Sequence, residues 1–327
     1  MKLFNYLPEM TKLDKKGQLK VRVKINPLKV FWQRLKQTHD AEKLKLKLIR
    51  KYNLNITTRT FENYIYKSAI PLKFIYALVK FTKNYQLWNS IFDEMDAVCY
   101  RCSGAGKTLW VKLPKEITAE LAYLAGALRD GNLNIKIGRT FIAQKEDKAW
   151  LKQKITNIFE NTFGIKPTID ERATIYSFPI AYFLYAVLQH KPGRQTEWET
   201  PSWIFKIPNK LKRIYVRGYF DAEGTSNPKR MKIAISQGWY KREIAPSLVE
   251  IKKILKEVGI ESSLEGPYRK VKRWSFMSNV VIYCKKNPKN GILFFEKIGT
   301  EHNNKIKNLT KIYRVCQDEL IDSHNRA

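Results

Sequence analysis

The chain has 327 residues, and its 61 lysines and arginines outnumber its 30 aspartates and glutamates, which gives a formal net charge of +31 at pH 7. Hydrophobic residues make up 44% of the chain and aromatic residues 13%, which excludes a largely disordered protein, and the length suits two or three domains. Lysines interrupt every apolar stretch that could cross a bilayer, and Pro8 and Glu9 fall where a signal peptide would stay apolar. We therefore expect a cytoplasmic protein that does not enter a membrane.

The positive charge predicts a polyanionic partner, and nucleic acid is the first candidate. The excess is spread along the chain, at +12 in residues 1–100 and +19 in residues 101–327, so a single basic tail does not account for it. A genome that shifts all of its proteins toward lysine is the alternative explanation. The charge alone does not distinguish DNA from RNA.

The four cysteines offer one candidate metal motif. Cys99 and Cys102 have the spacing of a zinc knuckle, but Cys284 and Cys316 are not close together in the sequence. The pattern favours reduced structural thiols over a zinc site.

The N-terminal region contains three short segments with helical periodicity, at residues 41–52, 58–69 and 70–83. A helix, a tight turn and a second helix resemble the helix-turn-helix of repressor-type DNA-binding domains. In that interpretation the second helix lies in a major groove, and its contacts come from Arg59, Thr60, Asn63 and Lys67. The alternative is a small all-α bundle that only packs against the rest of the protein.

From residue 117 onward the chain contains an internal repeat. The first copy starts at residues 117–133 and the second at 211–227, and each begins with an apolar helix that ends in an acidic residue and a glycine. Each copy then follows the order αββαββα, and a glutamine, Gln144 or Gln237, lies 14 residues after the acid. We expect an α+β fold of two pseudo-symmetric repeats with antiparallel sheets, preceded by an all-α helix-turn-helix domain. The expected boundaries are: N-terminal helical domain, 1–100; linker, 101–116; first repeat, 117–190; inter-repeat linker, 191–210; second repeat, 211–316; C-terminal tail, 317–327.

Small residues on both repeat helices predict that the two helices pack closely. Their acidic ends, Asp130 and Glu223, would then meet, and two adjacent carboxylates repel each other unless a cation binds between them. A hard divalent cation with oxygen ligands fits this arrangement and could activate water near a phosphodiester. The alternative is that both acids are ordinary helix-end carboxylates, although a carboxylate there is unfavourable with the helix dipole.

Residues 218–224, GYFDAEG, closely resemble the LAGLIDADG signature, and residues 121–131, LAYLAGALRDG, resemble it more loosely. The chain resembles a single-chain, two-repeat LAGLIDADG homing endonuclease of the archaeal type over about residues 108–316. This resemblance implies a monomeric enzyme that cuts double-stranded DNA at a long asymmetric site, uses Mg²⁺ or Mn²⁺, and serves intron mobility.

By position, the family's metal-binding acids correspond to Asp130 and Glu223, and the carbonyls of Arg129 and Ala222 are lesser candidates. Ala125 stands where the family has a glycine. The polar residues and lysines that the family places near its metals correspond best to the set Gln144, Lys145 and Gln237, with Lys229 or Lys232 as possible substitutes for a missing second lysine. Asp221 is interpreted as an interface residue rather than a ligand.

Strand alternation should expose basic side chains on one face of each sheet for contacts with guanine edges and phosphates. The candidates are Lys136, Arg139, Arg172, Arg230, Lys232, Arg269, Lys272 and Arg273. Two other functions remain open on the same fold: a non-catalytic DNA-binding regulator, and a maturase that binds intron RNA.

Overall fold

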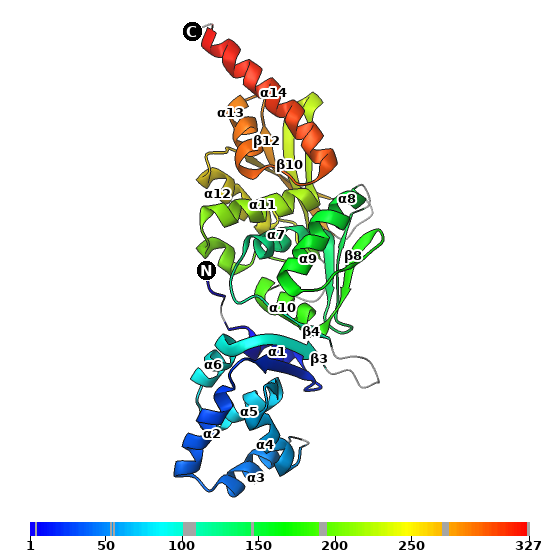
Figure 1. The fold of residues 1–327 in the computed structure, drawn as a ribbon. Helices are drawn as coiled ribbons and strands as arrows, with labels where there is room; N and C mark the ends of the chain where they lie inside the picture. The colour runs from blue at the N-terminus through cyan, green and yellow to red at the C-terminus, as the bar shows by residue number, and fades with distance from the viewer. Residues whose placement is uncertain are drawn as a thin grey trace. The chain divides into compact units, whose positions relative to one another are not determined.

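The computed structural model describes residues 1–3, 5–52, 54, 56–100, 109–144, 147–189, 195–269 and 275–325 (Figure 1). The chain divides into two compact units. The N-terminal unit consists of Lys2–Glu116 together with Ser177–Ala186, and the C-terminal unit consists of Met1, Ile117–Tyr176 and Val187–Ala327. Within the described part of the chain, no helix is long and apolar enough to cross a membrane.

The N-terminal unit is not all-α, so this expectation was wrong. It contains a four-stranded sheet in the order β2-β1-β3-β4, and the pairs β1–β2, β1–β3 and β3–β4 are antiparallel. The strands are β1 (Leu19–Val23), β2 (Ala69–Pro71), β3 (Met95–Tyr100) and β4 (Trp110–Val111). Strand β1 buries every second side chain, a half-buried pattern in a segment too short to stand out beside the helices. Strand β4 falls inside the expected linker 101–116, of which residues 101–108 lie outside the described residues.

The expected helices of this unit are present. Helices α3 (Ala41–Lys51), α4 (Thr58–Tyr66) and α5 (Leu72–Thr82) match the three periodic segments, and Asp40 and Thr57 cap the first two. The remaining helices are α1 (Leu7–Leu13), α2 (Pro27–Thr38), α6 (Gln86–Glu94) and the first nine residues of α10 (Phe178–Leu188). Segment 177–186 was expected to belong to the first repeat. Its Phe178 ring instead stacks on Tyr100, with ring centroids 4.2 Å apart.

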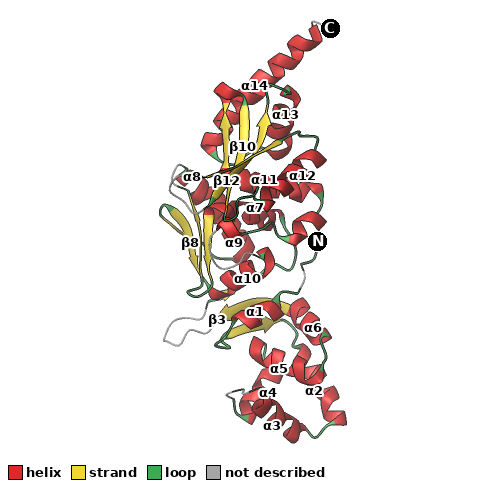
Figure 2. Ribbon diagram, turned by 180° about the vertical axis from the view of Figure 1, so that it is seen from behind, coloured by secondary structure: helices red, strands yellow, loops and turns green. Residues whose placement is uncertain are grey.

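The C-terminal unit begins with the elements expected for the first repeat (Figure 2). The helical elements are α7 (Ala119–Ala127), the 3-10 turn η1 (Leu128–Asp130), α8 (Lys148–Trp150), the π-helical turn η2 (Leu151–Ile155) and α9 (Thr156–Phe163). The strands are β5 (Gly131–Asn134), β6 (Arg139–Ala143), β7 (Thr168–Ile169) and β8 (Arg172–Tyr176). Gly164 ends α9 at φ +72°, a left-handed conformation that favours glycine.

The second repeat follows two short 3-10 turns, η3 (Gln195–Glu197) and η4 (Ser202–Lys206). Its helical elements are α11 (Asn209–Glu223), the 3-10 turn η5 (Pro228–Arg230), α12 (Pro246–Glu257), α13 (Pro288–Leu293) and the π-helical turn η6 (Phe294–Ile298). Its strands are β9 (Gly224–Asn227), β10 (Lys232–Trp239), β11 (Ser263–Arg269) and β12 (Phe276–Tyr283). The last helix, α14 (Asn303–Asn325), runs through the expected boundary between residues 316 and 317 without a break, so the described part of that tail is helical.

The two sheets of the C-terminal unit have the same strand order. The first sheet runs β5-β6-β8-β7 and the second runs β9-β10-β12-β11, and all pairs are antiparallel. In each sheet the first two strands follow a repeat helix directly. The expected αββαββα order occurs twice along the chain, but the last helix of the first copy, α10, lies largely in the N-terminal unit.

Three of the four cysteines lie in the described residues, where they are buried and free. Burial raises the pKa of Cys99 to about 11, which keeps this thiol protonated at neutral pH. A Cβ atom at Gly291 would lie 2.6 Å from Cys316 Sγ and 3.1 Å from Cys284 Sγ, so these two thiols share one site beside this glycine. The described residues contain no group of three or more His, Cys, Asp or Glu side chains that could hold a metal, and Cys102 lies outside them.

Candidate active site

Helices α7 and α11 pack through backbone contact. A Cβ atom at Gly126 would lie 2.2 Å from the carbonyl oxygen of Tyr215, and a Cβ atom at Gly218 would lie 2.2 Å from the carbonyl oxygen of Tyr123. Neither position can hold a side chain without moving a backbone. The small residues in the two repeat helices therefore produce the predicted close pair, although the contact residue in α7 is Gly126 rather than its neighbour Ala125.

The 3-10 turn η1 compensates for this one-residue difference. Glu223 follows Gly218 by five residues in a continuous α-helix, whereas Asp130 follows Gly126 by only four. From Gly218 to Glu223, five α-helical steps of about 1.5 Å advance the chain by about 7.5 Å along the helix axis. From Gly126 to Asp130, one α-helical step and three 3-10 steps of about 2.0 Å advance it by about the same amount. Asp130 and Glu223 thus end their helices at the same distance from the contact between the glycines.

The sheets start in the same register after each acid. Gly131 pairs with Ile142, and Gly224 pairs with Ile235, at the same spacing of eleven residues. A Cβ atom at Gly131 would lie 2.4 Å from the carbonyl oxygen of Phe141, and one at Gly224 would lie 2.4 Å from that of Phe220, so each turn from helix to strand requires glycine. Each acid consequently leads into a hairpin of the same construction.

Asp130 is a partly buried carboxylate. Desolvation raises its pKa from the ordinary 3.8 to about 6, and the positive charge of Lys305 opposes this shift. The ionised form of a carboxylate that is costly to desolvate is stabilised when a cation binds beside it. Because Mg²⁺ is commonly held by one or two carboxylates plus waters and phosphate oxygens, Asp130 and Glu223 fit the ion that the resemblance implies.

Lys305 on α14 is the lysine beside these helix ends, and the sequence analysis missed it. Its Nζ donates to the carbonyl oxygens of Phe220 and Asp221 at 2.9 and 2.7 Å, where a cation complements the helix dipole of α11. The start of α14 is held by two carboxylates: the Glu301 amide donates to Asp221 Oδ2 at 3.0 Å, and the Asn303 amide donates to Asp147 Oδ2 at 2.8 Å. No sequence signal links Lys305 to residues some 80 positions earlier.

Asp221 is fully buried and acts as an interface residue, in agreement with its sequence interpretation. Tyr123 Oη donates to its Oδ2 at 2.5 Å, Trp150 Nε1 donates to Tyr123 Oη at 2.8 Å, and Thr300 Oγ1 donates to Asp221 Oδ1. Burial raises the pKa of Asp221, and these hydrogen bonds lower it. The carboxylate oxygens are thus committed to protein donors.

The two glutamines occupy equivalent register positions, each two residues beyond the strand partner of a motif glycine. Gln237 is only 2% exposed: Tyr219 Oη donates to its Oε1, and its Nε2 donates to the carbonyl oxygen of Gly238 at 3.1 Å. The side-chain amide of Gln237 therefore points into the core, on the face of the second sheet that packs against α11. The backbone N–H of Gln144 donates to the backbone carbonyl oxygen of Glu171 at 3.3 Å. Lys145 lies outside the described residues.

Arg129 is also fully buried and does not face solvent. Its Nη1 and Nη2 donate to the carbonyl oxygens of Trp198 and Glu199, both at 2.7 Å, and the guanidinium lies 5.1 Å from the Tyr219 ring centroid. These contacts anchor the segment between the repeats.

Arg139 and Arg172 lie on the more exposed face of the first sheet. Arg139 pairs with Tyr176, and the guanidinium groups of Arg139 and Arg172 lie 5.4 and 4.7 Å from the centroid of Phe141 on the same face. Lys136 is exposed in the turn between β5 and β6. Two arginines held by one aromatic ring give this face a fixed pair of donors.

The predicted DNA-binding residues of the second repeat lie in different places. Lys232 lies on the less buried face of the second sheet, where its Nζ forms a 3.2 Å ion pair with Glu265 Oε2. Arg230 is exposed in η5, and Arg269 is exposed at the end of β11. Lys272 and Arg273 lie outside the described residues.

In the N-terminal unit, α3 buries Leu44 and Leu48, and α4 buries Phe61 and Ile65. The Phe61 ring packs against Trp32 of α2 and Phe74 of α5. Arg59 and Lys67 are exposed, Asn63 is half-buried, and the Thr60 hydroxyl lies 3.0 Å from that of Thr57. The predicted contact residues therefore lie on or beside α4, on its more exposed side.

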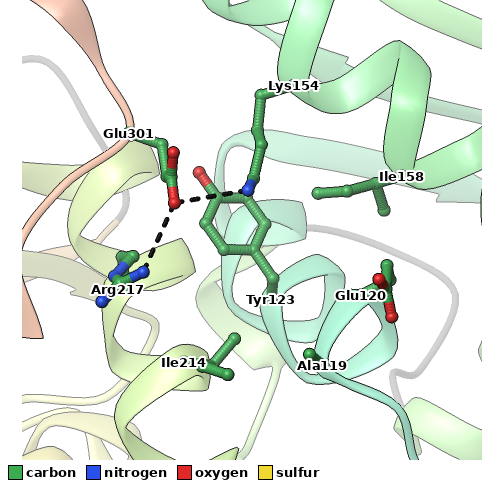
Figure 3. Close-up of a pocket in the computed structure, with 8 residues that line it drawn as sticks. All are labelled: Ala119, Glu120, Tyr123, Lys154, Ile158, Ile214, Arg217 and Glu301. Atoms are coloured by element: carbon green, nitrogen blue, oxygen red, sulfur yellow. Dashed lines mark hydrogen bonds and ion pairs between the residues drawn. The ribbon is translucent and has the colours of Figure 1, made fainter.

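A pocket of about 110 Å³ is lined by residues of both repeat helices, α7 and α11 (Figure 3). Glu301 Oε1 lies 3.3 Å from both Lys154 Nζ and Arg217 Nη1, and Tyr123 forms part of the wall. None of the predicted catalytic residues lines this pocket. Its ion pairs join elements of both repeats to the segment that precedes α14.

Residues 210–299 match the sequence model of the LAGLIDADG-like domain. The second repeat is therefore similar to the LAGLIDADG-like domain. The chain is also similar to homing endonuclease I-ApeI of Aeropyrum pernix, with 26% identity over 159 residues that cover 43% of this chain and 67% of that protein. These two matches confirm the resemblance to the LAGLIDADG homing endonuclease family.

A further similarity is to the isomerizing glutamine–fructose-6-phosphate aminotransferase of Methanocaldococcus jannaschii, with 25% identity over 214 residues. The match covers 62% of this chain but only 18% of that protein. The LAGLIDADG-like match contains residues 210–223 of α11, with Glu223, and the whole second sheet.

Proposed function

We propose that this protein is a site-specific, metal-dependent endonuclease that cleaves double-stranded DNA. The observation that carries the proposal is the paired construction at Asp130 and Glu223: two helices in close contact at Gly126 and Gly218 each end in a carboxylate and lead through a required glycine into hairpins of equal register. Such duplication suits a substrate with two strands. It also supports two pseudo-symmetric repeats, each placing one acid beside the opposite repeat.

In this proposal Asp130 and Glu223 would hold a divalent cation, Mg²⁺ or Mn²⁺, which would supply Lewis-acid activation of water and stabilisation of charge on the phosphate. Lys305 caps α11 and so fixes the helix end that carries Glu223. Arg139 and Arg172 hold the phosphates or guanine edges of the duplex on the first sheet.

The N-terminal unit adds a second contact region in this proposal. Helix α4, capped by Thr57 and packed on α3, would present Arg59, Thr60, Asn63 and Lys67 to a neighbouring major groove. The intact chain would act as a monomer on a long asymmetric site.

The test begins with a duplex selected for binding from a randomised library. The wild-type protein should cut this duplex when Mg²⁺ is present and stop when the metal is chelated. Asp130→Asn and Glu223→Gln should still bind but should not cut, because each removes a metal ligand without changing the sheets. Cleavage by both variants at the wild-type rate would contradict the assignment of the site.

A DNA-binding regulator is the second candidate, and the helix-turn-helix pattern around α3 and α4 favours it. Specific binding without cleavage under any divalent metal would select this function. A preference for structured intron RNA over every duplex tested would instead select a maturase.

A further inference from the structure

The register of the second sheet defines a face that is less buried than the face beneath the helices. One face of β10 and β12 buries Ile233, Ile235, Val280 and Ile282 beneath the helices. On the other face Ala234 and Val281 are buried, and the other side chains of β10 and β12 are partly exposed. On this less buried face, Lys232 of β10 pairs with Tyr283 of β12, and Ser236 pairs with Asn279. Glu265 of β11 pairs with Asn279 on this same face. If the proposed function is correct, this face lies against the DNA.

Glu265 is unusual on such a face. Among the residues that the structure assigns to the eight strands of the two sheets, it is the only acidic one. A carboxylate gains nothing from DNA phosphates, which repel it. A carboxylate that faces DNA can, however, accept a hydrogen bond from the amino group of cytosine.

The surroundings of Glu265 fix its orientation without covering it. Lys232 Nζ lies 3.2 Å from Glu265 Oε2, and Tyr283 Oη donates to Glu265 Oε1. The Lys232 and Glu265 side chains keep 26% and 22% of their surface exposed. The hydrogen bond from Tyr283 also lowers the pKa of Glu265, so its oxygens act only as acceptors at neutral pH. The ammonium and carboxylate therefore present a donor and an acceptor side by side.

We propose that Lys232 and Glu265 together read one G·C base pair in the major groove of the target DNA. In the major groove the guanine O6 and N7 acceptors lie beside the cytosine N4 amino donor. The Lys232 ammonium donates to the guanine edge, and Glu265 accepts from cytosine N4. Glu265 is thereby a specificity-determining residue, and the two half-sites are recognised by different chemistry: arginines on the first sheet and an acid–base pair on the second.

The experiment compares the base preferences of wild type and Glu265→Gln by selection from a randomised duplex library with the intact protein in Ca²⁺. The wild type should select G·C at one position of its site. Glu265→Gln should lose that preference by about 10-fold or more and tolerate A·T there, because a glutamine amide can pair with adenine, while other positions stay unchanged. Identical preferences at every position would overturn the proposal.

The matched control is Glu257→Gln, which breaks a comparable 2.8 Å ion pair with Lys212 on α11 and α12, away from the strands. It should leave every position of the site unchanged, and a change equal to that of Glu265→Gln would overturn the proposal. If the wild type selects no sequence at all, the proposed function itself fails, which is a different result from specific binding that ignores Glu265.

A second measurement distinguishes base reading from a phosphate contact. Lys232→Met should weaken binding to the selected duplex but leave the dependence of log K on log salt concentration unchanged, because no phosphate contact is lost. A fall of about one in that slope would assign Lys232 to a phosphate and overturn the proposal. Circular dichroism spectra of all variants, matched to wild type, serve as the folding control.

Discussion

Tyr123 of the first repeat donates a 2.5 Å hydrogen bond to Asp221 of the second, in the fully buried contact between helices α7 and α11. The Asp221 carboxylate also accepts the Glu301 amide N–H at 3.0 Å, which brings the start of α14 to the same place. One buried acid thus joins both repeats to the last helix.

We expect Tyr123→Phe to lower the free energy of unfolding by about 1–3 kcal/mol, because the buried carboxylate and Trp150 Nε1 both lose a partner. Urea denaturation followed by circular dichroism measures this change. Tyr240→Phe removes a hydroxyl from a side chain that is 47% exposed and should change stability by less than about 0.5 kcal/mol. Equal effects of the two substitutions would contradict the role assigned to Tyr123.

The contact between Gly126 and Gly218 predicts a severe effect of a single methyl group. Gly218→Ala should destabilise the C-terminal unit by about 3 kcal/mol or more, because the new Cβ would lie 2.2 Å from a backbone oxygen that cannot move alone. Gly238→Ala meets only side-chain atoms at 3.3 Å or more and should cost less than about 1 kcal/mol. Thermal unfolding by calorimetry would rank the two, and the reverse order would refute the close helix contact.

The raised pKa of Asp130 predicts how stability depends on pH. Folding favours the protonated form of this carboxyl, so its contribution is most favourable below pH 4 and is lost as pH rises through about 6. Asp130→Asn should therefore be more stable than wild type at pH 8, by roughly 2 kcal/mol after allowance for partial exposure, and should match wild type near pH 4.

Mg²⁺ should reverse this difference. Added Mg²⁺ should raise the Tm of wild type at pH 8 because it binds the ionised carboxylate, and it should have little effect below pH 5 or in Asp130→Asn. Unfolding curves at pH 4 and pH 8, with and without Mg²⁺, provide the measurement. A Tm increase of the same size in Asp130→Asn would place the cation elsewhere.

Lys305 should stabilise the end of α11. Lys305→Ala removes two charge-assisted hydrogen bonds and should cost about 1.5–3 kcal/mol, and it should also raise the pKa of Asp130 further because a positive charge is lost. Lys307→Ala, an exposed lysine two residues later in the same helix, is the matched control and should be close to neutral. Comparable losses of stability in both variants would show that any lysine lost from this part of α14 has the same effect, and would contradict the specific role of Lys305.

The parts of the fold that depend on local pattern could be predicted from the sequence. The small residues of the repeat helices, the acid–glycine steps at Asp130 and Glu223, and the two αββαββα orders are all visible in short windows. What could not be predicted depends on distant pairing. Strand β1 forms a sheet only with partners about 50 and 75 residues later, and Lys305 reaches its site only through the course of α14. The side-chain direction of Gln237 depended on strand register, which the sequence left open.

The N-terminal unit takes its core from two separate stretches of chain. Phe183, from the segment after the first sheet, is fully buried and meets the Tyr6 ring edge-on at 4.8 Å between centroids. No single cut of the chain can therefore release this unit whole: a fragment ending at Glu116 lacks Phe178 and Phe183, and a fragment starting at Ile117 carries both without Tyr100 and Tyr6. The two units are interleaved in sequence, so they cannot be exchanged between proteins as simple end-to-end modules.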